Sequence, residues 1–332
     1  MRLLRITLTC LAGAAVVLIG FTRVDWTSVL SSILAARPVP VVGAGAVVLV
    51  TLVLVTVRWA ALLGVSSGAP VAVRLWHSVV AAQAVNIVAP FRLGEGVRLA
   101  STSRWASLSL GRVAGALAIE RIFDMVAFAV AVLALAALGV MPDVFAGSAQ
   151  ATLTLGALAG VVLLTAIYGM PRLIAAIRTV RPEPDTGMRR RVGRWLLGQA
   201  EESYAGWRSL SPSRLAWSGA VTVLILISSA TTNLLVLRAF SLAVPWFAAL
   251  VLLVVLQVGT AVVSVPGNVG VFHYLTVVTL GAWQVPADEA LAAAVVLHAV
   301  SLGPKMVLGG LALAWFGGSA AWRPAASPGR PA

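Results

Sequence analysis

Residues 86–100 read NIVAPFRLGEGVRLA, an apolar segment interrupted by three charges and three residues that disfavour a continuous helix. The charges are Arg92, Glu95 and Arg98, and the interrupting residues are Pro90, Gly94 and Gly96. Proline has no amide hydrogen to donate within a helix, and glycine lets the backbone turn closely. The segment therefore predicts one helix that ends near Pro90 and a second that begins near Glu95.

The composition around this segment is that of a membrane protein. Of the 332 residues, 60% are hydrophobic and only 11% are charged, whereas a soluble domain has about 25% charged residues. The segments of alternating polarity that are typical of a transmembrane barrel are absent from the sequence. The fold class is therefore predicted to be all-α, as a polytopic helical membrane protein.

Several apolar runs are long enough to cross about 30 Å of hydrocarbon. They are residues 6–21, 41–57, 113–140, 151–170, 215–237, 245–265 and 290–316. Two further apolar segments, 75–89 and 269–285, are interrupted. We therefore expect about 7–9 membrane segments, including two broken or re-entrant helices, in one domain over residues 1–320. Its two repeat-like halves, about 1–180 and 190–320, are joined by a cytoplasmic linker, and 321–332 form a disordered tail.

Charge predicts the orientation of these segments. With the N-terminus in the cytoplasm, Lys and Arg divide 19 to 3 between cytoplasmic and outer stretches, and two lie within spans. By the positive-inside rule, both termini and residues 172–214 are cytoplasmic in a multi-pass protein of the cell membrane. This division of Lys and Arg requires that residues 75–89 enter the membrane and return to the same side, and that residues 269–285 cross the membrane fully. The amphipathic stretch 189–208 either lies along the cytoplasmic surface or is a solvated loop helix.

A second break resembles the first. Residues 264–275 read SVPGNVGVFHYL, in which Pro266 and Gly267 interrupt an apolar run. Gly270 follows Pro266 by four positions, just as Gly94 follows Pro90. Matching breaks in two halves of a chain indicate a transport site between repeats. The motif is short, so a chance match is the alternative.

Charges within spans are costly and usually face a cavity or each other. Glu120 and Asp124 are four residues apart and share a helical face with Arg121 beside them. This group forms either an ion-pair knot with Arg92, Arg98 or Arg112, or a polar step in a transport path. Lys305, in the last span, needs a carboxylate or carbonyl partner. The carboxylate candidates are Glu95, Glu120 and Asp124.

We predict that the two breaks meet near the protein's centre and form a lipid-headgroup site. Freed amides, with Arg92 and Arg98, hold a phosphate, while Glu95 and His273 contact the rest of the headgroup or carry a proton. The alternatives are an ordinary cytoplasmic loop at the first break and a packing role for His273. The candidate site comprises Asn86, Pro90, Arg92, Gly94, Glu95, Arg98, Glu120, Arg121, Asp124, Pro266, Gly267, Asn268, Gly270, His273 and Lys305.

Other classes of function find no support in the sequence. The net charge of +13 lies in loops between apolar runs, with no basic patch interleaved with aromatics, so no nucleic-acid partner is expected. One Cys and three scattered His predict no metal site. No catalytic grouping and no Gly-rich phosphate loop with Lys occur, so neither an enzyme nor a cofactor nor a nucleotide-driven pump is expected.

Four segments carry a family resemblance. They are RWAALLG from Arg58, NIVAPFRLGEGVRLA from Asn86, ERIFDM from Glu120 and VPGNVGVF from Val265. In this order they resemble the stand-alone, flippase-like transmembrane domain of the lysylphosphatidylglycerol synthases. The resemblance implies a helical domain that moves or handles a lipid across the cytoplasmic membrane. Full-length synthases add a soluble domain that transfers lysine from tRNA to phosphatidylglycerol, and none follows here, so no aminoacyl transfer is expected.

The resemblance has one clear departure. The family usually has Pro-Gly-Gly-x-Gly with a Glu where this chain has His273, and Asn268 replaces a Gly. Related stand-alone members handle polyprenyl-linked sugars or other envelope lipids, so membrane lipids are the expected partners. The leading hypothesis is translocation or handling of an anionic or polyprenyl-linked envelope lipid. The alternatives are a non-transporting subunit that partners an envelope-biosynthesis enzyme, and an ion-coupled carrier of small solutes.

Overall fold

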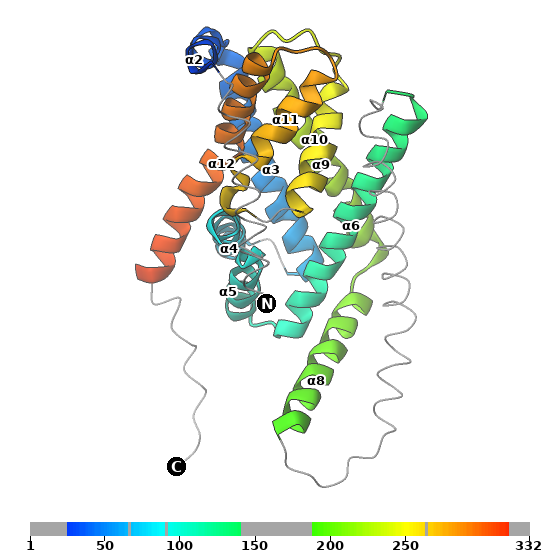
Figure 1. The fold of residues 1–332 in the computed structure, drawn as a ribbon. Coiled ribbons are helices and arrows are strands. Elements are labelled where there is room, and N and C mark those ends of the chain that lie inside the picture. The colour runs from blue at the N-terminus through cyan, green and yellow to red at the C-terminus, as the bar shows by residue number, and fades with distance from the viewer. Residues whose placement is uncertain (1–24, 66–67, 90–91, 141–187, 263–264, 319–332) are drawn as a thin grey trace, which may run out of the picture.

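The computed structural model describes residues 25–65, 68–89, 92–140, 188–262 and 265–318, and its regular elements there are all helical (Figure 1). The first five are α2 (Trp26–Ala35), α3 (Pro38–Leu63), α4 (Ala69–Val88), α5 (Gly94–Ala106) and α6 (Leu110–Ala137). The others are α8 (Met188–Arg208), α9 (Pro212–Ala239), α10 (Ala248–Val262), the 3-10 turn η3 (Pro266–Asn268), α11 (Val271–Gly281) and α12 (Ala287–Gly318). The predicted spans 6–21 and 151–170 and the tail 321–332 lie outside the described residues.

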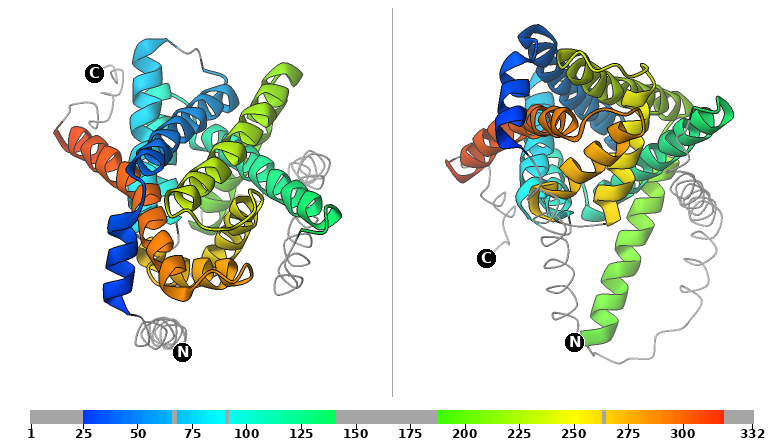
Figure 2. Two further views of the ribbon diagram at one scale, coloured as in Figure 1. Left: turned by 90° about the horizontal axis from the view of Figure 1, so that it is seen from above. Right: turned by 45° about the horizontal axis from the view of Figure 1, so that its top comes forward.

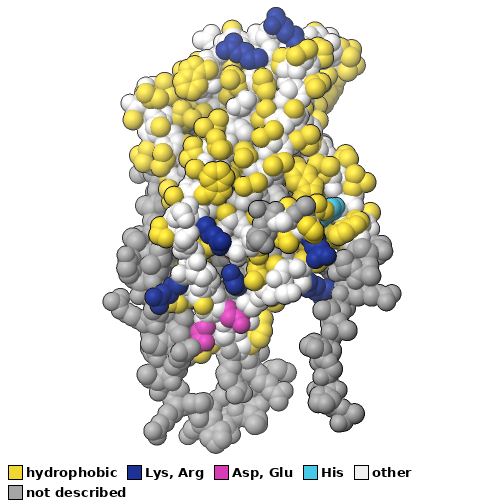
Figure 3. Space-filling model, turned by 180° about the vertical axis from the view of Figure 1, so that it is seen from behind, with side chains coloured by type: hydrophobic (Ala, Val, Ile, Leu, Met, Phe, Trp, Pro, Cys, Tyr) yellow, Lys and Arg dark blue, Asp and Glu magenta, His cyan; other side chains and the backbone are white. Residues whose placement is uncertain are grey.

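The polytopic helical membrane fold is confirmed. Four helices are long and apolar enough to cross a membrane, namely Pro38–Leu63, Pro70–Val88, Pro212–Ala239 and Ala287–Phe316. The 28 residues of α6 make a helix of about 42 Å, which is also long enough. On the face drawn in Figure 3, apolar side chains cover a broad band, with Lys and Arg above and below it. Such a surface suits acyl chains around the middle and water or headgroups at the ends.

Two helices hold the middle of the bundle together. α3 and α9 lie side by side, as seen from above in Figure 2. The hydroxyl of Thr51 on α3 donates to Ser228 Oγ on α9 at 2.9 Å. The other described helices are arranged around this pair.

The first interrupted segment is a re-entrant hairpin, as predicted. Helices α4 and α5 run antiparallel, because Ser78 Oγ lies 2.7 Å from Ser101 Oγ while the amide of Gly94 donates to Asn86 Oδ1 at 2.8 Å. A Cβ at Gly94 would overlap the carbonyl oxygen of Ala82, so only glycine allows this approach. The chain enters and leaves the hairpin at one end of the bundle, where Arg112 Nη2 donates to the carbonyl of Leu63 at 3.3 Å.

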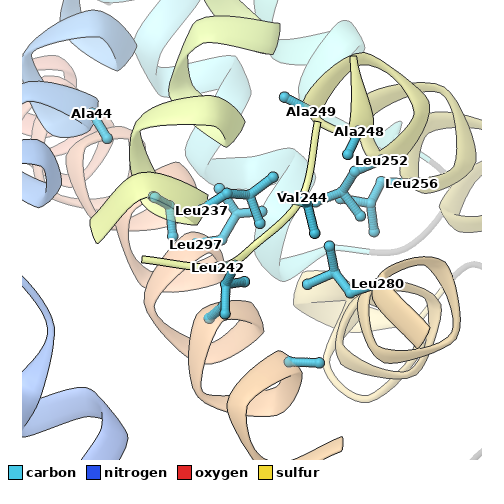
Figure 4. Packing of buried hydrophobic residues seen from close by; sticks show 13 residues of the cluster. Ala44, Leu237, Leu242, Val244, Ala248, Ala249, Leu252, Leu256, Leu280 and Leu297 are labelled. Carbon is cyan, nitrogen blue, oxygen red and sulfur yellow. The ribbon is translucent and has the colours of Figure 1, made fainter. Parts of the chain in front are cut away.

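The prediction that 245–265 spans the membrane and 269–285 crosses fully is wrong. α10 and α11 form a second antiparallel hairpin, in which Gly259 lies against Leu275 and Leu252 shares a core cluster with Leu280 (Figure 4). Their 15 and 11 residues make about 22 and 16 Å of helix, too short to cross about 30 Å of hydrocarbon. One hairpin and two crossings both return the chain to its starting side. The count of Lys and Arg on each side therefore cannot tell them apart.

The two hairpins enter from opposite ends of the bundle. The end of α9 and the start of α12 flank the second hairpin in a cluster that includes Leu237, Leu280 and Ala290. The end of α3 and the start of α6 flank the first hairpin in another cluster, which includes Leu63 and Val113. α3 joins these two ends, since its residue Ala44 belongs to the cluster of the second hairpin.

Helix α8, which contains the predicted amphipathic stretch 189–208, packs along α6. Gly111 meets Gln199, and Gly115 meets Trp207, so the two helices run parallel (Figure 1). The indole of Trp207 donates to the carbonyl of Gly115 at 2.8 Å, and Ser203 Oγ donates to that of Gly111 at 2.6 Å. Because glycine has no side chain, the helices approach closely enough to form these bonds.

Candidate functional site

Three helices bring their charges together inside the bundle. Arg98 of α5 donates from both terminal nitrogens to the two carboxylate oxygens of Glu120 of α6, each at 2.8 Å. Arg58 Nη2 of α3 lies 3.5 Å from Glu120 Oε1, and these two side chains are only 3% and 2% exposed. The guanidinium carbon of Arg98 lies 3.9 Å from the ring centroid of Trp59. Arg121 Nη2 also lies 3.5 Å from Glu120 Oε1, so Glu120 has three basic partners, and a buried carboxylate requires such pairing.

The remaining charges complete what we name the ion-pair cluster: Arg58, Glu95, Arg98, Glu120, Arg121 and Asp124. Arg121 Nη2 lies 2.5 Å from Glu95 Oε1, and its Nη1 lies 3.2 Å from Asp124 Oδ2. Arg58 Nη1 lies 2.6 Å from Asp124 Oδ1 and also donates to Thr222 Oγ1 of α9 at 2.8 Å. With three bases and three acids, the cluster has no formal net charge.

Of the two readings of the acidic pair on α6, the structure shows the ion-pair knot. Its partners are Arg58 and Arg98, and not Arg92 or Arg112. The alternative of a polar step in a path is compatible with the same geometry, because the cluster also lines a cavity.

The cavity has a volume of about 710 Å³ and is lined by residues of α3, α4, α5, α6, α9, α10, α11 and α12 together with both breaks. Asn86 and Arg92 line it from the first break, and Gly267 and Asn268 line it from the second. His298 Nε2 of α12 lies 2.8 Å from the carbonyl oxygen of Gly267. Helix α4 contacts η3 directly. The tips of the two hairpins therefore meet at one cavity.

Most of the predicted site residues line this cavity. They are Asn86, Arg92, Glu95, Arg98, Glu120, Arg121, Asp124, Gly267, Asn268 and Lys305. The predicted residues Gly94, Pro266, Gly270 and His273 lie beside it without lining it. Pro90 lies outside the described residues.

The residues of the second break that do not line the cavity shape the backbone. Gly270 has φ of +85°, which favours glycine, and caps the start of α11. His273 is buried, and its Nδ1 accepts from the amide of Gly270 at 3.3 Å. Its ring centroid lies 4.8 Å from that of His298, which does line the cavity. His298 thus takes the cavity position for which His273 was predicted.

Several expected phosphate ligands already have partners within the protein. The amide of Gly94 donates to Asn86, Arg98 is bound to Glu120, and Glu95 is bound to Arg121. These groups position the first hairpin tip and close the ion-pair cluster.

Lys305 does not form the predicted pair with Glu95, Glu120 or Asp124. No carboxylate of the described ranges lies within 4.0 Å of it. α12 continues through Pro304 as one helix. On α12, Gly309 packs against Val80 and Ala84 of α4, and Trp315 stacks on His77 further back along α4. This antiparallel packing places Lys305 beside the last turn of α4.

The sequence also contained signals that were missed. Arg58 was counted as a loop charge, but α3 continues to Leu63, so Arg58 lies within the helix and is 2% exposed. Its place in the RWAALLG segment was the available clue. A polar face on α9 was missed as well: Thr222, Ser229, Thr232 and Asn233 line the cavity at helical spacing.

The comparison with known families agrees with the resemblance in the sequence. The family model described as "Lysylphosphatidylglycerol synthase TM region" matches residues 3–309, which include the ion-pair cluster and both hairpins. No curated protein was found to match the chain. The chain belongs to the family of the lysylphosphatidylglycerol synthase TM region.

Proposed function

We propose that this protein translocates an anionic or polyprenyl-linked envelope lipid across the cytoplasmic membrane. One observation carries the proposal: two re-entrant hairpins from opposite ends of an apolar bundle meet at a polar cavity. Irregular backbone at membrane depth is tolerated where it is buried in protein or lines a wet cavity. A headgroup is the part of a lipid that needs such a cavity, because its acyl chains are already soluble in the bilayer.

The hairpins also offer a way to open the cavity to either side. Both hairpin tips line the cavity, each at the end of a hairpin that enters from a different end of the bundle, and the arms of the second hairpin have 15 and 11 residues. Inverted elements around a central site are typical of alternating access. Translocation of this kind needs no covalent step, and its partners are membrane lipids.

The function is tested by reconstituting the purified protein into vesicles that contain a phospholipid with a fluorescent headgroup. A membrane-impermeant quencher reaches only the outer leaflet of empty vesicles. We expect it to reach lipid from both leaflets when the protein is present. Quenching that stays at the level of empty vesicles for every lipid tested would contradict the proposal. Uptake of a soluble headgroup without lipid movement would instead favour the small-solute carrier.

We also propose that both termini and residues 188–214 face the cytoplasm. Leaving out Arg58 and Arg98, which are buried in the bundle, Lys and Arg still divide 17 to 3 between the two sides. On a Cys10→Ser background, Ser327→Cys should resist an impermeant thiol reagent added to intact cells. Ala287→Cys, at the opposite end of the bundle, should be labelled. Labelling of Ser327→Cys by reagent added outside the cells would contradict the proposed orientation.

A further inference from the structure

Two cations of the cavity wall lack a partner. Neither Arg92 nor Lys305 forms a hydrogen bond or ion pair with another group in the part of the chain that the structure describes. Lys305 lies beside the last turn of α4, and Arg92 follows the break at the end of that helix. Because the ion-pair cluster is neutral, these two residues leave the wall with two formal positive charges in excess. Lys305 is partly buried among apolar helices, where an unpaired cation is costly, and Arg92 is exposed and lines the same cavity. An anion is therefore the expected occupant.

A second part of the wall accepts hydrogen bonds. The hydroxyls of Ser229, Thr232 and Thr260 donate to main-chain carbonyls of their own helices at 2.8, 3.1 and 2.6 Å. Asn233 Nδ2 donates to the carbonyl of Ala249 at 3.1 Å. The three hydroxyl hydrogens and one of the two amide hydrogens of Asn233 are thus used within the protein, and lone pairs on the side-chain oxygens remain. A ligand that faces these three hydroxyls must donate hydrogen bonds to them.

An ammonium group could donate such bonds, but it would add a positive charge to a wall that already carries two in excess. The carboxylates that line the cavity are Glu95, Glu120 and Asp124, and all three are bound to arginines. A neutral hydroxyl donates without needing a carboxylate. Apolar side chains such as Leu226 and Leu253 line other parts of the cavity, which favours a lipid over a free polyol phosphate.

We infer that the cavity selects an anionic phospholipid with a neutral polyol headgroup, such as glycerol or inositol, over lipids with an amine. Lys305 and Arg92 hold the phosphate, and the polar faces of α9 and α10 accept hydrogen bonds from the headgroup hydroxyls. This inference rests on the proposed function and names its substrate class. The inferred ligand therefore differs from lysylphosphatidylglycerol, the aminoacylated lipid after which the family is named.

Native mass spectrometry of the full-length protein in detergent micelles provides the test. The probes are phosphatidylglycerol, phosphatidylinositol, phosphatidylethanolamine and lysylphosphatidylglycerol at equal mole fractions. We expect the two polyol lipids to bind about tenfold more tightly than the lysyl lipid, a factor that corresponds to about 1.4 kcal/mol. Lys305→Met should reduce phosphatidylglycerol binding about tenfold, whereas Lys305→Arg should retain it. Arg74→Gln is the matched control, since Arg74 is an exposed cation of α4 outside the cavity wall.

Three results would overturn the inference: lysylphosphatidylglycerol binding as tightly as phosphatidylglycerol, Lys305→Met leaving binding unchanged, or equal binding of soluble glycerol 3-phosphate. The lipid comparison uses the unaltered protein, so it remains decisive if Lys305→Met fails to fold. The vesicle assay separates this inference from the proposed function. Movement of a polyprenyl-linked lipid without preferred binding of the polyol lipids would keep the function and reject the inference. Lys305-dependent binding of phosphatidylglycerol without lipid movement would keep the inference and reject the proposed function.

Discussion

Replacing Glu120 by leucine is expected to lower the free energy of unfolding by about 3–5 kcal/mol. The side chain of Glu120 is 2% exposed and accepts two hydrogen bonds from Arg98, with Arg58 at 3.5 Å. Leucine fills similar space but leaves these two buried guanidiniums with fewer partners. The expected result is a large loss of folded protein, measured by denaturant titration in detergent or by the temperature at which the solubilised protein aggregates.

A double variant separates loss of the ion pair from loss of packing. Arg98→Met together with Glu120→Leu removes both charges of the bidentate pair while Arg58 keeps Asp124 at 2.6 Å. We expect the double variant to be more stable than Glu120→Leu alone, because an apolar pair replaces an unpaired charge. Glu289→Leu, which replaces an exposed acid at the start of α12, should unfold like the unaltered protein. Glu120→Leu behaving in the same way would show that the cluster does not stabilise the fold.

The first hairpin was predictable because its sequence marks where the first helix ends and where the second begins. Pro90 and Gly94 mark the break, and the charges at Glu95 and Arg98 exclude one continuous apolar helix. The second hairpin was not predictable in the same way. The runs on both sides of Pro266 are apolar, and hydropathy measures only whether a run is long enough to cross. Whether it does cross depends on packing between α10 and α11.

The site was predictable in its residue types and not in its pairing. Sequence spacing placed Glu120 and Asp124 on one face of α6, but nothing in it could show that α3 brings Arg58 to that face. The same limit explains Lys305. It was predicted to pair with Glu95, Glu120 or Asp124, but these carboxylates are bound to arginines. Contacts between distant segments arise only when the helices pack together.

Blocking the cavity is expected to abolish lipid movement while the protein still folds. Ser229 lines the cavity in the middle of α9, where its small side chain leaves open space. In Ser229→Trp the indole would occupy that space and obstruct a headgroup. The cavity gives the indole room, so overpacking should cost no more than about 1–3 kcal/mol. We expect quenching in the vesicle assay to fall to the level of empty vesicles, with a normal elution profile of the purified protein.

Ile227→Trp is the matched control for this prediction. Ile227 lies two residues from Ser229 on the same helix but is 55% exposed on the outer surface of the bundle. An indole there replaces one lipid-facing apolar side chain by another and leaves the cavity unchanged, so translocation should continue at the normal rate. Equal activity of the two variants would mean that lipids do not pass through the cavity, for instance because they move along the outer face of the bundle. Loss of activity in Ser229→Trp alone would identify the meeting point of the two hairpins as the route, because only that variant obstructs it.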